Sequence, residues 1–169
     1  MKRNLLIVLT CFLILSAATL SEAEERKQTR IHYSSDFGWK ADQDVTEAFQ
    51  QLLESGKLKP GDEMRVQHTY RIAGSHNLPD NFTLSAVKGA GFDVTDAAEP
   101  KNNRALLELG NGTVLRNLAI TYLNTPPLGP TGEKHEVNFT RRLGIQARGK
   151  RDIRIENCRL TGSIGHHLK

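Results

Sequence analysis

Cysteine is almost absent from this sequence, which has only Cys11 and Cys158 in 169 residues. Cys11 lies in an apolar stretch near the N-terminus that has the features of a removable export signal, so Cys158 alone remains for the folded chain. A single cysteine excludes an internal disulfide framework and a CxxC-type zinc site. Aromatic residues make up only 6% of the chain. The core must therefore be mostly aliphatic, and stability must come from its packing.

A long hydrophobic run is missing as well. The longest, residues 5–18, is too short for a membrane-spanning helix, which needs about 20 apolar residues. Basic residues precede this run, and Ser21-Glu22-Ala23 follows it with small residues at the −3 and −1 positions of a cleavage site. The pattern predicts a signal peptide at residues 1–23 and a secreted or periplasmic protein with no stable membrane span after cleavage. An uncleaved anchor is the alternative.

An excess of positive charge is also lacking once the signal is removed. The formal net charge is +4, and loss of Lys2, Arg3 and Glu22 lowers it to +3. No cluster of Lys and Arg with interleaved aromatic residues occurs, and export also argues against a nucleic-acid partner. We therefore expect no nucleic-acid binding. Residues 24–35 begin with a charged stretch that lacks apolar residues and are predicted to be a lead-in linker, which leaves residues 36–169 as one domain.

One helix is expected in this domain. Apolar residues recur at helical spacing on one face: Val45, Ala48, Phe49, Leu52 and Leu53. Asp44 and Glu47 have the spacing of a capping box, and Gly56 follows where a C-terminal cap is expected. We find no second helical pattern. Residues 64–72 alternate like one strand with a buried face, and further short β-type runs lie at residues 82–84, 105–109, 113–120, 143–145 and 153–160.

The sequence contains an internal repeat. Residues 113–121 align without gaps on residues 153–161, at an offset of 40. Each copy follows a turn and reads aliphatic, x, Asn, apolar, x, aliphatic, Thr. Short strands that repeat with turns and no intervening helix predict a solenoid, with two unrelated look-alike pieces as the alternative. The offset exceeds one coil because the Pro- and Gly-rich residues 124–134 form an inserted loop, which is either functional or disordered.

The asparagine of each repeat, Asn117 or Asn157, marks a sharp corner between two strands. One residue of such a corner must adopt the left-handed conformation, which Asn tolerates better than other non-glycine residues. Leu115, Leu118 and Ile120 would then point inward on either side of the corner. We also expect the two amides to bond to each other as a ladder inside the coil.

Several motifs resemble the opening of right-handed parallel β-helix proteins of the pectate lyase superfamily. Those proteins begin with a [DN]-[FY]-G-A-x-G-D stretch and a capping helix. The similar residues here are Asp36-Phe37-Gly38-Trp39-Lys40-Ala41-Asp42, Leu58-Lys59-Pro60-Gly61-Asp62, Tyr70-Arg71-Ile72, residues 78–84 and Gly89-Ala90-Gly91. Trp39 and Ala41 depart from the pattern, since a small residue and a glycine are usual there.

The resemblance implies an all-β fold, a right-handed parallel β-helix (solenoid) whose N-terminal α-helix caps the first coil. At about 22 residues per coil, the domain has room for about four coils. Enzymes of this family usually have more, so we expect the N-terminal part of a longer protein or a truncated gene product. A solenoid without a polar terminal repeat exposes an apolar end. That end would be covered by a partner or by self-association.

The family acts on polysaccharides, the lyases with Ca²⁺ on clustered carboxylates and the hydrolases with paired Asp. Neither constellation can be transferred onto this chain. Asp93, Asp96 and Glu99 are the best candidates for Ca²⁺ ligands, because Ca²⁺ takes several oxygens. A solvated acidic loop is the favoured alternative for this group.

Two further pairs are candidate groove residues. His166 and His167 lie where the next coil would begin, although adjacent strand residues face opposite sides. Arg141 and Arg142 could bind an acidic sugar, with a solvated basic face as the alternative. The sequence thus predicts a secreted β-helix protein that acts on or binds polysaccharide, either as a lyase or glycoside hydrolase or as a non-catalytic module that binds carbohydrate or a surface partner.

Overall fold

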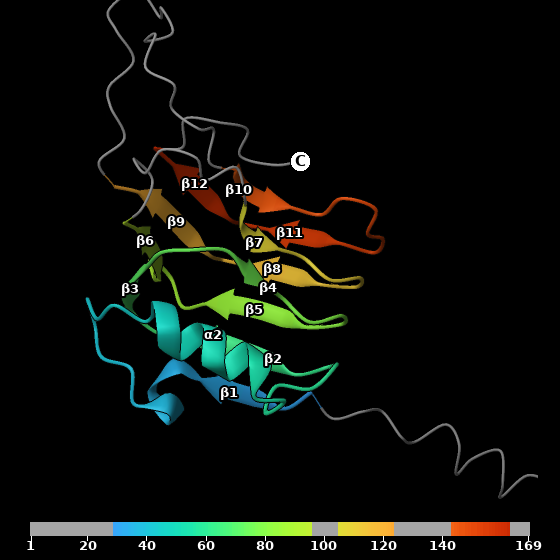
Figure 1. The fold of residues 1–169 in the computed structure, drawn as a ribbon, viewed down its shortest axis with the longest axis horizontal. Helices are drawn as coiled ribbons and strands as arrows, with labels where there is room; N and C mark the ends of the chain where they lie inside the picture. Colours follow the sequence, from blue (N-terminus) through green and yellow to red (C-terminus); the bar gives the residue numbers. More distant parts are fainter. Residues whose placement is uncertain (1–28, 96–104, 124–142, 163–169) are drawn as a thin grey trace, which may run out of the picture.

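The computed structural model describes residues 29–95, 105–123 and 143–162. Its strands form three sheets, and within each sheet the strands are parallel and follow one another along the same direction (Figure 1). Sheet A contains β1 (Ile31–Tyr33), β2 (Glu63–Val66), β5 (Thr83–Ala86), β8 (Val114–Arg116) and β11 (Arg154–Glu156). Sheet B contains β3 (Thr69–Ile72), β6 (Gly91–Val94), β9 (Ala119–Tyr122) and β12 (Arg159–Thr161). Sheet C contains β4 (His76–Asn77), β7 (Ala105–Glu108) and β10 (Leu143–Gln146).

The predicted repeat is confirmed as a pair of stacked layers, each made of a sheet A strand and the sheet B strand that follows it. Val114 pairs with Arg154 between β8 and β11, and Ala119 pairs with Arg159 between β9 and β12. Every strand pair in the described residues is parallel and joins segments distant in sequence. Mostly β structure with stacked parallel strands and one α-helix is the arrangement expected of a parallel solenoid.

Residues with positive φ form columns at the corners. The column before sheet A consists of Gly61, Asn81, Gly112 and Asp152, with φ values of 95°, 53°, 64° and 60°. The column before sheet B consists of Gly89, Asn117 and Asn157, with φ values of 84°, 57° and 52°. The left-handed conformation predicted for the two asparagines is therefore confirmed. Each column contains only Gly, Asn or Asp, the residues that tolerate this conformation best.

The single strand predicted over residues 64–72 is wrong. The chain turns at Gln67 and His68, so that β2 belongs to sheet A and β3 to sheet B. The inward residues of both strands are fully buried, whereas His68 at the corner is exposed. Apolar alternation continues through the corner because both strands contribute to one core. Alternation alone cannot distinguish one long strand from two short ones joined by a turn.

Helix α2 (Thr46–Glu54) lies at the end of the stack where β1 is found, away from β10, β11 and β12 (Figure 1). Its inward residues Val45, Phe49 and Leu52 are buried, as predicted for a cap. The ring of Phe49 packs 5.6 Å from that of Phe92 and 5.9 Å from that of Trp39, measured between centroids. Burying one such aromatic side chain contributes about 1.5–3 kcal/mol.

The start of α2 differs from the predicted capping box. Val45 occupies the N-cap position and has no side-chain capping bond. Asp44 instead precedes the cap, and its Oδ1 accepts a hydrogen bond from the N–H of Thr46 at 3.0 Å. The backbone and side-chain bonds from Thr46 lower the pKa of Asp44, and they outweigh its partial burial. The short chain before the helix is therefore closed by an Asp turn instead of a reciprocal cap.

The core consists of columns of apolar side chains that run along the stack. Met64, Leu84 and Leu115 form one column in sheet A, and each is fully buried. Tyr70, Phe92 and Ile120 form the equivalent column in sheet B. Leu115, Leu118 and Ile120 therefore point inward, as predicted. In the three described ranges, no helix is long and apolar enough to cross a membrane.

Candidate functional site

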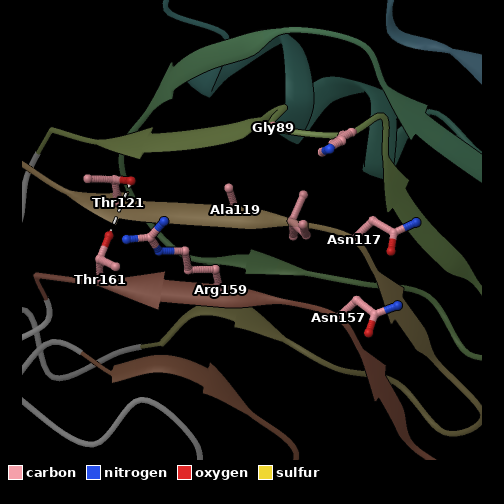
Figure 2. Close-up of a pocket in the computed structure, with 9 residues that line it drawn as sticks. Gly89, Asn117, Ala119, Thr121, Asn157, Arg159 and Thr161 are labelled. Atoms are coloured by element: carbon pink, nitrogen blue, oxygen red, sulfur yellow. Dashed lines mark hydrogen bonds between the residues drawn. The ribbon is translucent and has the colours of Figure 1, made fainter.

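A groove of about 820 Å³ lies on the outer face of sheet B (Figure 2). Its floor and walls come from β9, β12 and the corners that precede them, and Lys88 and Gly89 close it on the β6 side. Both copies of the repeat contribute equivalent residues to this one groove. Asn117 and Asn157 occupy equivalent corners, and Thr121 and Thr161 occupy equivalent strand positions in register.

Two small residues lie in register on sheet B beside the groove. Gly91 of β6 pairs with Ala119 of β9, which pairs in turn with Arg159 of β12. A methyl group at Gly91 would overlap the backbone carbonyl of Ala119, so glycine is required there for the two strands to approach. Ala119 itself belongs to the lining of the groove, together with Lys88 and Arg159.

Hydroxyl and amide groups supply neutral hydrogen-bonding partners in the groove. The Oγ1 of Thr161 donates a hydrogen bond to the Oγ1 of Thr121 at 3.3 Å. Asn117 and Asn157 are both exposed, and Figure 2 shows their amides turned outward from the corners. The amide ladder expected inside the coil is therefore wrong. The stacking of the corners is carried by the backbone instead, where the N–H of Asn117 donates to the carbonyl of Glu156 at 2.9 Å.

The charged groups that line the groove are both cationic. Lys88 and Arg159 are exposed, and Figure 2 shows the guanidinium of Arg159 directed toward Thr121 and Thr161. No carboxylate belongs to the described lining. The groove therefore combines two positive charges with donors and acceptors that suit hydroxyl groups. This chemistry fits an anionic, hydroxyl-rich ligand, since guanidinium and ammonium groups form charge-assisted bonds to carboxylates.

Asp93, one of the three predicted Ca²⁺ ligands, does not lie in a solvated acidic loop as favoured from the sequence. It belongs to β6, where its neighbours Phe92 and Val94 are buried on the inner face and Asp93 faces outward in register with Thr121. Its partial burial, together with the charge of Asp42, raises the pKa of the Asp93 carboxyl. The alternation of the apolar residues Phe92 and Val94 around Asp93 could have indicated this strand.

The other predicted site residues lie outside the described residues: Asp96, Glu99, Arg141, Arg142, His166 and His167. Within residues 29–95, 105–123 and 143–162, no group of three His, Cys, Asp or Glu side chains is placed to hold a metal ion. Four lining residues were not among the candidates predicted from the sequence: Lys88, Thr121, Arg159 and Thr161. The repeat itself contained the signal, because Thr121 and Thr161 are the last residues of its two copies.

Comparisons with protein-family models, with curated proteins and with solved structures found no match to this chain. The stacked parallel sheets and the groove on sheet B therefore provide the structural basis for a functional proposal. The sequence motifs add the resemblance to parallel β-helix proteins.

Proposed function

We propose that this chain forms an exported right-handed β-helix of the pectate lyase superfamily, with about four coils, and that it binds an acidic polysaccharide in the sheet B groove. The observation that supports this proposal is the pairing of two cations with repeated hydroxyl and amide groups in one open groove. The export signal predicted from the sequence supports this proposal, because acidic polysaccharides are found outside the cytoplasm.

A linear polymer suits the groove because its polar groups repeat along the stack. Adjacent strands of a sheet lie about 4.8 Å apart, so Thr121 and Thr161 present the same hydroxyl at two successive steps, as Asn117 and Asn157 present the same amide. Hydroxyls on the ligand can bond to these groups. Carboxylates on the ligand can bond to Lys88 and Arg159.

Binding without cleavage is the favoured form of this activity. Glycoside hydrolysis of the usual kind needs two carboxyl groups that flank the scissile bond. The described lining of the groove contains none, and Asp93 is a single carboxylate on the neighbouring strand. A Ca²⁺-dependent lyase remains the alternative, with Asp93 as its one described candidate ligand.

The test is calorimetric titration of the purified protein with polygalacturonate oligomers and with a neutral glucan. We expect binding of the acidic oligomer only. The double variant Lys88→Ala/Arg159→Ala should weaken binding about a hundredfold or more, because each of the two lost charge-assisted bonds contributes about 1.5–3 kcal/mol. Arg148→Ala is a matched control, since Arg148 is an exposed cation outside the groove lining.

Equal affinity for the neutral glucan, or equal loss in Arg148→Ala, would exclude specific binding in this groove. The same samples are assayed for unsaturated product with and without Ca²⁺. Product that requires Ca²⁺ and disappears in Asp93→Asn would replace the binding proposal with the lyase alternative.

A further inference from the structure

The layer that contains β11 and β12 exposes apolar residues whose equivalents are buried one layer below. Ile155 is 36% exposed, whereas its register partner Leu115 is fully buried. Leu160 is half-buried, whereas its partner Ile120 is 1% exposed. Ile153 and Cys158 are also only partly covered. The core columns therefore end at an apolar surface, which we call the end face and define as Ile153, Ile155, Cys158 and Leu160.

One edge of strand β11, at the end face, also has no strand partner among the described residues. In the described part of the chain, β11 pairs with β8 on one side and with no strand on the other. An unpaired strand edge presents a row of N–H and C=O groups that readily pairs with another strand. The end face thus combines apolar surface with a hydrogen-bonding edge, and both are satisfied by the same kind of partner, another β-strand laid along β11.

The sequence of β11 is complementary to itself when two copies run antiparallel. Its three residues are Arg154, Ile155 and Glu156. An antiparallel pair centred on Ile155 places Arg154 of each copy opposite Glu156 of the other, and the two Ile155 side chains opposite each other. Directly opposed residues of opposite charge stabilise such a pair, and like charges destabilise it. A parallel copy in the same register would instead oppose Arg154 to Arg154 and Glu156 to Glu156.

The side chain of Glu156 is already oriented for a second cation. Its Oε2 accepts a bond from the Nε of Arg116 at 2.8 Å, and both side chains remain substantially exposed. The other carboxylate oxygen has no protein partner among the described residues. An arginine from the opposite side would continue the ladder from Arg116 through Glu156 to Arg154 of the second chain.

We propose that the end face binds a second copy of this chain, through antiparallel pairing of β11 with β11 about a two-fold axis at Ile155. The contact is isologous, so it closes at a dimer and does not extend into a filament. It covers the exposed end of the core columns and pairs the free edge of sheet A. The inference does not rest on the polysaccharide proposal, because it uses the edge of β11 and the apolar end face, none of whose four residues lines the groove.

Sedimentation velocity tests this inference on the protein purified after export. It compares the wild type with variants in which charged residues of β11 are reversed. The wild type should form a concentration-dependent dimer. Arg154→Glu creates two Glu–Glu oppositions and should weaken dimerisation about tenfold or more. The triple variant Arg116→Glu/Arg154→Glu/Glu156→Arg reverses the whole ladder and should restore the dimer. Arg148→Glu makes the same charge change away from the edge and should have no effect.

Disulfide trapping gives a second measurement, which reports the residues that face each other across the dimer. A residue on the two-fold axis faces its own copy, so Ile155→Cys in a Cys158→Ser background should form a disulfide-linked dimer under mild oxidation. Ile153→Cys in the same background lies off the axis and should not. A monomer at every concentration, a dimer that Arg154→Glu leaves unchanged, or cross-linking at residue 153 and not at 155 would overturn the proposal. Protection of the β11 amides from hydrogen exchange in a monomer would show that the chain covers its own end face.

Discussion

The backbones of β6 and β9 approach so closely at Gly91 and Ala119 that a methyl group on Gly91 would overlap the carbonyl of Ala119. Gly91→Ala should therefore push the two strands apart and destabilise the protein by about 3 kcal/mol, the upper end of the usual cost of overpacking, because the overlap is with backbone. Urea unfolding followed by circular dichroism measures this change. Gly89→Ala is the control, because space around Gly89 is open and its smaller cost of about 1–2 kcal/mol comes only from positive φ. Equal effects at the two glycines would contradict the close approach.

Asn117 at the corner before β9 should tolerate glycine better than alanine. Its φ of 57° costs an alanine about 1–2 kcal/mol, whereas glycine adopts the same conformation without a Cβ penalty. The amide is exposed and makes no hydrogen bond to the core residues that the structure describes. Thermal unfolding of Asn117→Ala and Asn117→Gly compares the two. A glycine variant less stable than the alanine variant would show that the amide, and not the backbone conformation, is what the corner needs.

The stability and solubility of the protein should depend on the cap helix α2, mainly through its side chain Phe49. This side chain is fully buried and contacts Trp39, His76 and Phe92. Phe49→Ala should cost about 3–5 kcal/mol of unfolding free energy, measured by urea titration. Phe49→Asp should be insoluble, because it buries a charge and exposes the first layer. Gln51→Asp places the same charge on the exposed face of α2 and should stay soluble, so aggregation of both Asp variants would count against the cap.

Stability should fall in acid partly through Glu63. Burial alone would raise the pKa of this carboxyl, but bonds from Ser85 and Arg65, both 2.6 Å long, lower it below its ordinary value of 4.5. A group with a lowered folded-state pKa adds stability above its unfolded pKa and loses it as the pH falls through the folded value. Melting temperatures between pH 7 and pH 3 should therefore drop less steeply in Glu63→Gln than in the wild type. An equally steep drop in both proteins would place the acid sensitivity elsewhere.

Processing after Ala23 should yield a mature chain that starts at Glu24. Small residues at the −3 and −1 positions favour this cleavage. Mass spectrometry of protein secreted by an export-competent host gives the start residue directly. Replacing Ala23 with a bulky residue, as in Ala23→Phe, should leave the precursor uncleaved. If the variant instead yields a mature chain of the same mass as the wild type, cleavage does not depend on Ala23 and the predicted site is wrong.

Much of the local structure could be predicted because it depends on short-range preferences. The helix follows from the spacing of Val45, Phe49 and Leu52, and the corners follow from the few residues that accept positive φ. The single strand over residues 64–72 failed because apolar alternation is the same on both sides of a corner. The groove also escaped prediction, since its lining brings together Lys88 and Arg159, which are 71 residues apart in the chain.

By itself the sequence determined the stacked character of this protein, through one amphipathic helix, short strands and a repeat whose asparagines mark the corners. These features act over a few residues, where backbone sterics and side-chain periodicity decide the outcome. Only the tertiary structure decided which face each residue occupies across the stack. Parallel register places Lys88, Thr121 and Arg159 around one hollow and leaves Ile155 at the end of a core column, because neighbours in a solenoid are set by the pairing of distant strands.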